Sequence, residues 1–565
     1  MSRAPVEDVE ITVVVAKTRA AVAAAGPLPV LAVVPDQNTW NDYGFKLYAN
    51  LYVMTEPGEI SDSLPIRMMF PGEDATADVL SAEIQQRGIV FPLSDIGRPF
   101  CTLQNEAKQY ETLMQQLGFG GTIAGLRRLR DVVLAKLEGE DAEAIALSES
   151  EDFHVGMIRE AWRYTALRRG GRFLRPGPVP VATDAAATFS VTATPAGFAT
   201  SIHAEFDFEA DAIFEDRACV LIGRNGVGKT QLLKAIVDGL TDAPGRADDA
   251  ADVEISPAPK ISRLLVFSSV PSDPYPKTIP PWFDVDYEYF AVAAEATPLG
   301  PRFIESVLDC LRDDGSAFGP EDSPVTRLEL LESLLGERGM WTELNLPLRL
   351  DASADVFRRT TRIGDRLYVA LDQGMSEKQL NQLGALVDRS VAAIILAPGG
   401  PRRLSSGEVA MVHFVAQAVA SIENGSLLLL DEPETHLHPN YISVFMDLLQ
   451  DALERTSSVA IIATHSAYVL REVPRRRVGV LQRNDGATFV DRPRMQTFGA
   501  RIDDLSQFVF MDGDVSPRYR QRLAEWAREV GREMTVDDVL ETYGDELSPV
   551  TMSLVARAMK GGENS

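Results

Sequence analysis

An eight-residue glycine-rich loop limits what this chain can fold into more than any other stretch of the sequence. The loop follows an apolar run at 218–222, which predicts a buried strand, and precedes a helical pattern at 231–237. Backbone N–H groups of such a loop point at one anion, and the following helix adds its positive N-terminal end. The pattern G-x-x-x-x-G-K-[ST] in this setting predicts a nucleoside triphosphate site. Its residues are Gly223, Arg224, Asn225, Gly226, Val227, Gly228, Lys229 and Thr230, with Lys229 expected on the β- and γ-phosphates and Thr230 on Mg²⁺.

Two carboxylates at the end of a second apolar strand are suited to hydrolysis. The run 427–430 ends in Asp431 and Glu432. Asp431 suits water-mediated coordination of Mg²⁺, and Glu432 suits a general base that polarises the attacking water. A third apolar strand, at 459–464, delivers His465 at its end. The sequence therefore predicts metal-assisted cleavage of the bound triphosphate.

A serine–glycine motif lies between these two halves of the site. It opens a helical stretch at 409–422, and a Ser-Gly pair at a helix start offers hydroxyl and N–H groups to a phosphate. The motif consists of Leu404, Ser405, Ser406, Gly407 and Glu408.

Together these motifs, in this order, resemble those of the ABC-type ATPases over roughly residues 190–500. The resemblance implies ATP and Mg²⁺ as cofactors, a signature motif that completes the ATP site of another subunit, and contact between His465 and the γ-phosphate. The segment 431–439 is similar to the non-transporter branch, which includes the chromosome-maintenance, recombination-repair and OLD-type ATPases. The chain also resembles the ATPase subunits of antiphage systems such as Septu and of the retrons that carry Septu-like partners.

The expected fold class is α/β, with a P-loop ABC-type ATPase core in which helices flank a mixed sheet. A helical lid, an N-terminal α+β region and a helical C-terminal extension complete it, since heptads that would build a long coiled-coil arm are not sustained. The expected parts are 1–180, an N-terminal domain; 181–271, the lobe with the phosphate loop; 272–398, the helical lid; 399–500, the lobe with the signature, carboxylates and histidine; and 501–565, a helical C-terminal region.

Local patterns divide the N-terminal part further. Apolar stretches at 9–15, 28–34, 45–54 and 66–70 predict strands, and helical patterns occupy 75–87 and 105–137 with a break at 118–121. A hairpin is expected at 189–208, turning at 195–197.

Composition narrows the class of protein. The chain has 565 residues and a net charge of −27, which opposes a protein that coats DNA with its whole surface. No apolar run approaches the ~20 residues that cross a bilayer, and three scattered cysteines suggest no disulfide framework, so a cytoplasmic protein without a membrane partner is expected. Basic clusters predict a solvated face or partner-binding patch, or else nucleic-acid contact. They lie at 127–130, at 163–175 and at 475–477.

One position departs from the family pattern. ABC proteins often place a glutamine after the strand expected at 261–267, where it contacts Mg²⁺ and the attacking water. This chain has no glutamine there, and Ser268, Ser269 or Asp273 are candidates to replace it. Arg402 and Arg403, just before the signature, are candidates for phosphate or adenine contact across a dimer.

Three other constellations have simpler explanations. Glu434, His436 and His438 resemble zinc ligands, but residues two apart on a loop rarely converge on one ion. Asp512 and Asp514 form a D-x-D that a Toprim nuclease would use, although a turn is favoured and no nuclease is expected in this chain. The aromatic segment 40–44 also favours a turn with a packed Trp over a ligand site.

The preferred hypothesis is an ATPase that dimerises around ATP and thereby switches or restrains a separate effector, such as a nuclease or toxin, in antiphage defence. A DNA repair ATPase that clamps DNA is the alternative and predicts a continuous basic groove. The motor of a membrane importer is a third reading, which the missing glutamine opposes.

Overall fold

The computed structural model describes most of the chain. The described residues are 9–36, 44–182, 184–185, 187–195, 197–209, 217–241, 252–269, 272–283, 285–292, 301–313, 317–319, 323–336, 339–484, 487–510, 517–530, 534–544, 547 and 549–559. Residues 40–43 of the aromatic segment and the D-x-D at 512–514 fall outside these ranges.

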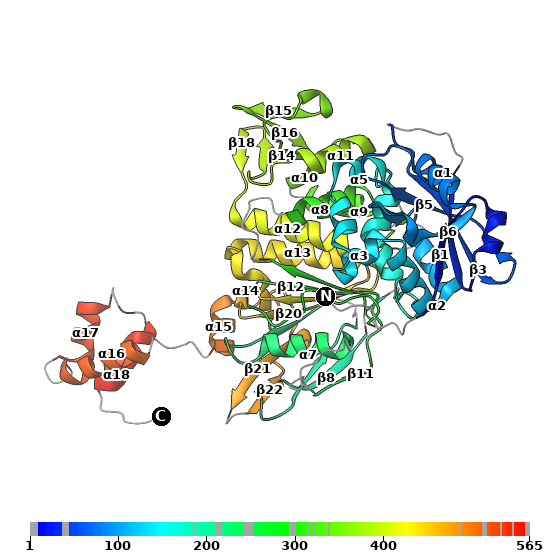
Figure 1. The fold of residues 1–565 in the computed structure, drawn as a ribbon. Helices are drawn as coiled ribbons and strands as arrows, with labels where there is room; N and C mark the ends of the chain where they lie inside the picture. The colour runs from blue at the N-terminus through cyan, green and yellow to red at the C-terminus, as the bar shows by residue number, and fades with distance from the viewer. Residues whose placement is uncertain are drawn as a thin grey trace.

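The N-terminal region is an α+β unit built on a seven-stranded sheet, as the strand patterns predicted (Figure 1). The strand order is β6-β1-β2-β3-β5-β7 with β4 paired to β3, and only β1 and β2 run parallel. Its elements are β1 (Thr12–Ala16), β2 (Val30–Pro35), β3 (Tyr48–Glu56), β4 (Glu59–Ile60), β5 (Leu64–Met69), β6 (Val90–Pro92), β7 (Cys101–Gln104), α1 (Thr76–Arg87), α2 (Lys108–Arg128), α3 (Val132–Glu138), α4 (Ala142–Leu147), α5 (Glu151–Gly156), α6 (Ala161–Arg169) and the 3-10 turns η1 (Arg19–Ala24), η2 (Leu93–Asp95) and η3 (Gly170–Phe173).

The predicted break in the long helical pattern is confirmed. Within α2, Gly118 has φ 67° and ψ 175°, a conformation that interrupts the helix. Glycine adopts positive φ without a steric penalty, so the chain turns there and resumes the helix toward Arg128. The helical pattern at 105–137 has a second break at Arg130, whose φ of 55° separates α2 from α3.

A second seven-stranded sheet forms the core that carries the predicted nucleotide site (Figure 1). Its order is β13-β12-β19-β20-β10-β21-β22, parallel except for the last pair, so the predicted mixed sheet flanked by helices is confirmed. Strands β10, β12, β19 and β20 are fully buried, as their continuous apolar runs predicted. The strands are β10 (Ala218–Ile222), β12 (Leu264–Ser268), β13 (Tyr287–Ala291), β19 (Leu427–Asp431), β20 (Val459–Thr464), β21 (Val478–Asn484) and β22 (Ala487–Asp491).

Helices cover this sheet, and a smaller sheet lies beside α7. The predicted hairpin is confirmed as β8 paired antiparallel with β9, and β11 adds a third strand. The elements are α7 (Lys229–Thr241), α12 (Ser406–Ser421), α13 (Pro439–Arg455), α14 (Ala467–Leu470), β8 (Phe189–Thr194), β9 (Ile202–Phe206), β11 (Asp252–Ser256) and the 3-10 turns η5 (Pro433–His436) and η6 (Arg475–Arg477).

Residues 272–398, expected to be helical, contain strands as well as helices. Beyond β13 in the core sheet, they build most of a five-stranded antiparallel sheet of order β15-β16-β14-β17-β18. These strands are four or five residues long, too short for period-2 alternation to stand out from the helical patterns beside them. The elements are α8 (Pro301–Leu311), α9 (Arg327–Gly336), α10 (Met340–Glu343), β14 (Leu344–Pro347), η4 (Ala354–Val356), β15 (Thr360–Ile363), β16 (Arg366–Ala370), α11 (Glu377–Leu386), β17 (Ile394–Ala397) and β18 (Gly400–Arg403).

The C-terminal region is helical, as predicted. It contains α15 (Ile502–Phe510), α16 (Pro517–Val530), α17 (Val536–Tyr543) and α18 (Pro549–Met559). Helices α16–α18 pack on one another around a small apolar cluster of their own, which includes Ala527, Val539 and Val555.

The arginines at 163–175 hold the N-terminal region against the ATPase core. Arg168 lies 2.9 Å from Asp309, Arg169 lies 3.7 Å from Glu423, and Arg172 lies 2.6 Å from Asp286 and 2.7 Å from Glu423. Arg163 and Arg175 are themselves buried. The expectation of a solvated or partner-binding face is therefore wrong for this cluster, because its acidic partners lie more than a hundred residues away and the local pattern cannot show them.

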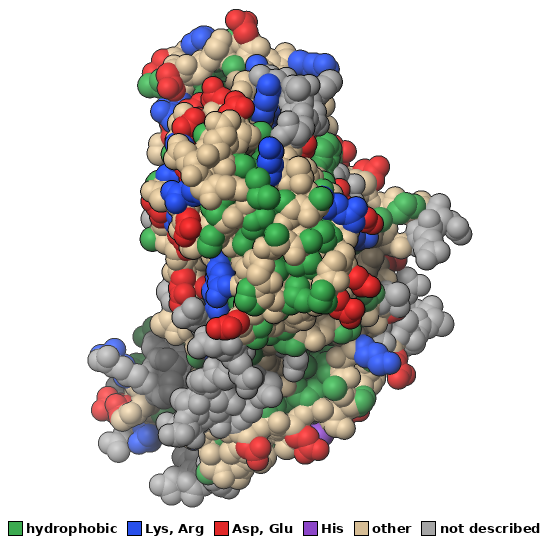
Figure 2. All heavy atoms as spheres, turned by 45° about the vertical axis from the view of Figure 1, so that its right-hand side comes forward, with side chains coloured by type: hydrophobic (Ala, Val, Ile, Leu, Met, Phe, Trp, Pro, Cys, Tyr) green, Lys and Arg blue, Asp and Glu red, His purple; other side chains and the backbone are tan. Residues whose placement is uncertain are grey.

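The other two basic clusters are largely engaged as well. Arg127 pairs with the buried Glu138, and Arg130 pairs with Asp141. Arg477 is buried and donates to the carbonyl of Glu209 at 2.9 Å. In the view of Figure 2, basic and acidic side chains are interspersed and form no continuous basic surface on that face.

Candidate functional site

The phosphate loop joins β10 to α7 in a conformation that requires glycine. Gly226 and Gly228 have φ of 78° and 113°. A Cβ on Gly228 would lie 2.6 Å from the ring of Phe198, and one on Gly223 would lie 2.6 Å from the carbonyl oxygen of Leu481. Gly226 and Gly228 are required by their positive φ, and Gly223 and Gly228 by the lack of space for a Cβ. Without side chains at these positions, the N–H groups of the loop can approach a ligand closely.

Lys229 begins α7 and is almost completely buried at the centre of this loop. Its Nζ donates to the carbonyl oxygens of Gly223 at 2.9 Å and Arg224 at 3.4 Å, and lies 3.7 Å from Glu432 Oε1. Burial lowers the pKa of Lys229, while the facing carboxylates oppose that shift. The loop therefore presents a single buried cation, which is the arrangement that a polyphosphate needs.

Asp431 ends β19 with no exposed surface. One carboxylate oxygen accepts a hydrogen bond from the hydroxyl of Tyr275 at 2.9 Å, and Thr230 is a second hydroxyl neighbour. Burial raises the pKa of Asp431 to about 6, although both hydroxyls lower it. The structure thus brings together the two residues predicted for Mg²⁺, Thr230 and Asp431.

Glu432 has a strained backbone. Its φ of 52° and ψ of 51° place it in the left-handed region, which costs a non-glycine residue about 1 kcal/mol or more. Its N–H donates to the carbonyl of Ala463 on β20 at 2.8 Å, and Oε1 lies 3.4 Å from His465 Nδ1. The chain turns at Glu432 so that this carboxylate faces both Lys229 and His465. The loop motif predicts that Lys229 contacts the γ-phosphate, and the resemblance to ABC-type ATPases implies the same for His465.

Glu434 is a site residue that the sequence analysis did not assign. It is buried, accepts hydrogen bonds from the hydroxyl of Thr464 and from the N–H of His465 at 3.3 Å, and lies 3.6 Å from His465 Nδ1. Burial raises the pKa of Glu434, and Thr464 and His465 lower it. Its position on a turn two residues after Glu432 is a local signal, but the sequence pattern indicated only a zinc ligand there.

Several buried polar atoms around the carboxylates have no hydrogen-bond partner among the described residues. They are Ser269 Oγ, Asp431 Oδ1, Glu434 Oε2 and His465 Nδ1. Unsatisfied buried polar atoms are costly, and their concentration here fits a site that a polar ligand completes. Mg²⁺ is usually held by one or two carboxylates together with substrate phosphates, and Thr230 and Asp431 are the residues here that would hold it. Across the described residues, no three His, Cys, Asp or Glu side chains are grouped to hold a metal by themselves.

The candidates for the missing glutamine occupy different places. Asp273 accepts from the hydroxyl of Tyr289 at 2.5 Å and from Lys277 at 2.6 Å, and Ser269 donates its N–H to the carbonyl of Asp431 at 3.1 Å. Tyr275, which no motif singled out, donates its hydroxyl to the Asp431 carboxylate. An aromatic residue seven positions beyond β12 gave no recognisable signal.

The signature lies at the start of α12 with exposed serines. Ser405 is the N-cap and forms a capping box with Glu408, and Ser405 and Ser406 are both exposed. Gly407 is buried, and a Cβ there would lie 3.0 Å from the ring of Tyr441. The N-terminal end of α12 is therefore open to a phosphate from another molecule.

Arg402 and Arg403 were candidates for contact across the dimer. Arg402 forms a two-point ion pair with Glu408 at 2.8 and 2.9 Å, and Arg403 is exposed on β18. Leu404 is partly buried beside them.

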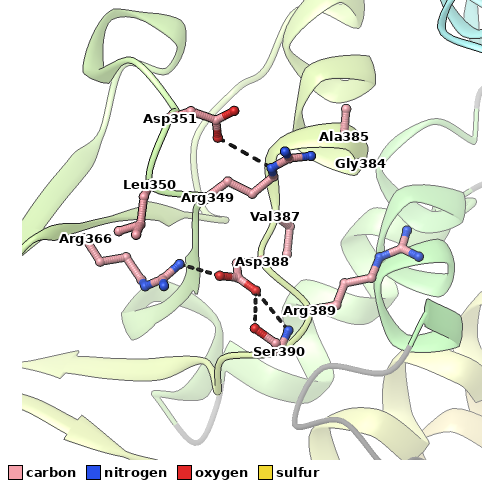
Figure 3. A pocket seen from close by; sticks show the side chains of 10 residues that line it. All are labelled: Arg349, Leu350, Asp351, Arg366, Gly384, Ala385, Val387, Asp388, Arg389 and Ser390. Atoms are coloured by element: carbon pink, nitrogen blue, oxygen red, sulfur yellow. Dashed lines mark hydrogen bonds and ion pairs between the residues drawn. The ribbon is translucent and has the colours of Figure 1, made fainter.

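A separate, open cavity of about 770 Å³ lies beside the five-stranded sheet and α11 (Figure 3). Arg349, Arg366 and Arg389 line it, and Arg366 is tied to Asp388 at 2.6 Å. All of its lining residues lie between 349 and 390, so this cavity shares none with the nucleotide site.

Two further expectations concern metal and membrane. The side chain of His436 is outside what the structure describes, so the rejected zinc constellation stays untested. Among the described residues, no helix combines the length and apolar character needed to span a bilayer.

Comparison with known proteins bears on the second half of this site. Residues 398–471 match the family described as "AAA domain, putative AbiEii toxin, Type IV TA system", a stretch that holds the signature, Asp431, Glu432 and His465. Protein ea59 of Escherichia phage lambda is 24% identical over 529 residues, which cover 90% of this chain and 91% of that protein.

Similar solved structures include the SMC head domain from Thermotoga maritima, with a TM-score of 0.26 and 12% identity over 54% of this chain and 98% of that one. The ATP-binding cassette of an ABC transporter in its ADP conformation has a TM-score of 0.27 and 11% identity, over 59% and 96%. Scores this low add no weight to any argument about function. The motif set, its geometry and the match at 398–471 support a P-loop ATPase domain of the ABC/AAA type.

Proposed function

We propose that this chain hydrolyses ATP with Mg²⁺, and that two copies close around two ATP molecules to switch or restrain a separate effector in bacterial antiphage defence. Lys229 and the loop N–H groups bind the β- and γ-phosphates, while Thr230 and Asp431 hold Mg²⁺. Glu432 orients and deprotonates the attacking water, and His465 contacts the γ-phosphate. Ser405, Ser406 and Gly407 of the second copy bind the same γ-phosphate from the other side.

The observation that carries the hydrolytic part is the convergence of Lys229, Asp431, Glu432 and His465 at the ends of neighbouring strands. Glu432 Oε1 lies 3.7 Å from Lys229 Nζ and 3.4 Å from His465 Nδ1, and Asp431 directly precedes Glu432 at the end of β19. The unsatisfied oxygens and nitrogen beside them support a ligand that accepts and donates hydrogen bonds.

The exposed signature supports the dimeric part. Ser405 and Glu408 bond to each other and to Arg402 and Tyr441, all from the same lobe. The N-terminal end of α12 is exposed, can bind an anion, and has no described contact with the phosphate loop. It is therefore suited to complete the ATP site of a second molecule. Loss of the γ-phosphate then removes the bridge and reopens the pair.

The role in defence is supported by the match to a family described with the AbiEii toxin and a toxin–antitoxin system. An effector nuclease or toxin encoded separately is the partner that this role implies. The rival reading, a clamp on DNA, receives less support because most arginines of the basic clusters are engaged inside the protein.

The test is molecular mass by light scattering, with and without ATP and Mg²⁺. Wild type should double in mass with ATP, Glu432→Gln should remain doubled, and Lys229→Ala should stay at the lower mass. If the mass of all three proteins is the same with and without ATP, the proposed switch is refuted.

Subunit mixing tests whether the site is shared. Lys229→Ala disables the phosphate loop, and Ser406→Arg blocks the signature while leaving the loop intact. Each variant alone should be inactive, and a mixture should regain ATPase activity because one composite site is whole. Ser94→Arg, at an exposed serine of the N-terminal region, is the matched control and should be active by itself. A mixture as inactive as its components would show that each site is complete within one subunit.

A further inference from the structure

A second, smaller cavity lies where the N-terminal region meets the ATPase core. It has a volume of about 250 Å³, the size of one small ligand, and both regions contribute to its wall. Lys136 on α3, Arg168 on α6 and Arg172 on η3 come from the N-terminal side. Arg263, Lys277 and Arg302 come from the core.

The wall combines an excess of cations with an apolar side. Six basic side chains face two acidic ones, Asp286 and Glu288. The apolar part of the wall consists of Leu137, Ile279, Pro280, Pro281, Tyr287 and Tyr289. A ligand that matches both parts carries a phosphate-like anion on one end and a ring or other apolar group on the other.

Four of the six cations have acidic partners, since Arg168 pairs with Asp309 at 2.9 Å and Lys277 with Asp273 at 2.6 Å. Asp286 and Glu288 pair with Arg172 and Arg263, at 2.6 to 3.4 Å. Lys136 makes no ion pair with a described residue, and Arg302 donates to the carbonyl of Tyr289 at 2.6 Å. Lys136 and Arg302 are both exposed, so each can turn to a bound anion without breaking an ion pair within the described structure.

A chain of hydrogen bonds joins this cavity to the candidate Mg²⁺ ligand. Lys277 and Tyr289, on the cavity wall, both contact the carboxylate of Asp273, at 2.6 and 2.5 Å. The same carboxylate accepts from the N–H of Tyr275 at 3.2 Å, and the hydroxyl of Tyr275 donates to Asp431 at 2.9 Å. A ligand that attracts Lys277 away from Asp273 therefore changes the hydrogen bonding of Asp273 to Tyr275, and Tyr275 positions Asp431.

We propose that this cavity binds a phosphorylated small molecule of mononucleotide size, and that its occupancy alters ATP hydrolysis through Lys277, Asp273, Tyr275 and Asp431. The regulatory part rests on the proposed ATPase activity, whereas the binding part does not. Since the cavity wall joins both regions, an occupant also links the N-terminal region to the state of the ATP site.

Binding is tested by calorimetry in the Lys229→Ala background, which removes the phosphate loop as a competing site. The probes are AMP, pyrophosphate as a phosphate without a ring, and adenosine as a ring without phosphate. We expect AMP to bind once per chain and more tightly than either fragment. The double variant Lys136→Glu/Arg302→Glu should weaken AMP about tenfold or more, because two favourable contacts become repulsive. Arg349→Glu/Arg389→Glu, in the cavity of Figure 3, is the matched control and should leave AMP binding unchanged.

Absence of AMP binding at millimolar concentration, or equal weakening by both double variants, would overturn the binding proposal. If pyrophosphate alone binds as tightly as AMP, the apolar wall has no role and the assigned ligand class is wrong.

Regulation is tested separately on the full chain with an intact phosphate loop. The ATPase rate should change at least twofold with AMP, and Asp273→Asn should abolish that response while AMP still binds. A response that persists in Asp273→Asn would refute the relay. AMP binding together with no ATPase activity under any condition would reject the proposed function and leave the cavity assignment standing.

Discussion

Arg327 allows a quantitative test of how the ATPase core is held together. It lies on α9 with no exposed surface, donates to the carbonyl of Ile422 at 2.6 Å and to Glu423 at 2.8 Å, and lies 3.1 Å from Asp313. Removing one partner from a buried charged network costs about 3–5 kcal/mol, because the remaining charges are left unpaired. We therefore expect Arg327→Met to lower the free energy of unfolding by about that amount.

The pKa of Glu423 gives an independent magnitude. Burial opposes its ionisation, but Arg327, Arg172 and Arg169 hold its pKa down, at about 2. Against an ordinary value of 4.5, this corresponds to about 3 kcal/mol at roughly 1.4 kcal/mol per pKa unit. Because the folded pKa is depressed, this stabilisation is present above pH 4.5 and is lost as the pH falls through about 2.

The assay is urea unfolding followed by circular dichroism, for wild type, Arg327→Met, Glu423→Gln and the double variant. Glu423→Gln should lose about 3 kcal/mol at pH 6, and its difference from wild type should shrink as the pH falls below 4. The double variant should lose less than the sum of the single changes. An Arg327→Met protein with the stability of wild type, or a Glu423→Gln difference that is independent of pH, would refute this account of the network.

Three further predictions concern the nucleotide site. Mg²⁺-dependent ATP binding should weaken as the pH falls through about 6, because burial raises the pKa of Asp431 to that value and the protonated acid is a poor partner for Mg²⁺. Titrations with Mg²⁺ between pH 5 and 8 check this. The Asp431→Asn variant should bind Mg²⁺ and ATP weakly at every pH. Glu434→Gln should bind ATP with unchanged affinity but hydrolyse it about tenfold more slowly, since His465 loses a charged neighbour at 3.6 Å. Single-turnover rates measured beside ATP affinities check this, and an equal loss of affinity and rate would contradict it. Gly228→Ala should lose nucleotide binding, because φ is 113° and the new Cβ would lie 2.6 Å from Phe198, whereas Gly336→Ala, with open space around it, should bind ATP normally in the same fluorescence titration.

The sequence predicted the core strands and the phosphate loop because those features are local. Continuous apolar runs at 218–222 and 459–464 are the mark of strands buried on both faces, and the structure places both in the middle of the sheet. The loop motif sits between β10 and α7, where the pattern placed it. The roles assigned to its residues stay predictions until nucleotide binding is measured.

Features that depend on distant partners could not be predicted. Tyr275 meets Asp431 across 156 positions, and Arg168 meets Asp309 across 141. Neither residue carries a local pattern, because an aromatic in a loop and an arginine in a basic run are compatible with many environments. The five-stranded sheet was not predicted for a related reason, since its strands are short and β14 pairs with β16 and β17 rather than with a strand next to it in sequence.

The place of β20 between β10 and β19 sets a length requirement on the side chains of the site. Neighbouring strands lie about 4.8 Å apart, so the phosphate loop and the carboxylates begin roughly 9.6 Å from each other. Lys229 and Glu432 nevertheless approach to 3.7 Å, which only long side chains reaching across the end of β20 can achieve. Aspartate at position 432 would withdraw the carboxylate by roughly 1.5 Å, one carbon–carbon bond. The charge would be conserved, but the shorter carboxylate would no longer reach Lys229 across the end of β20.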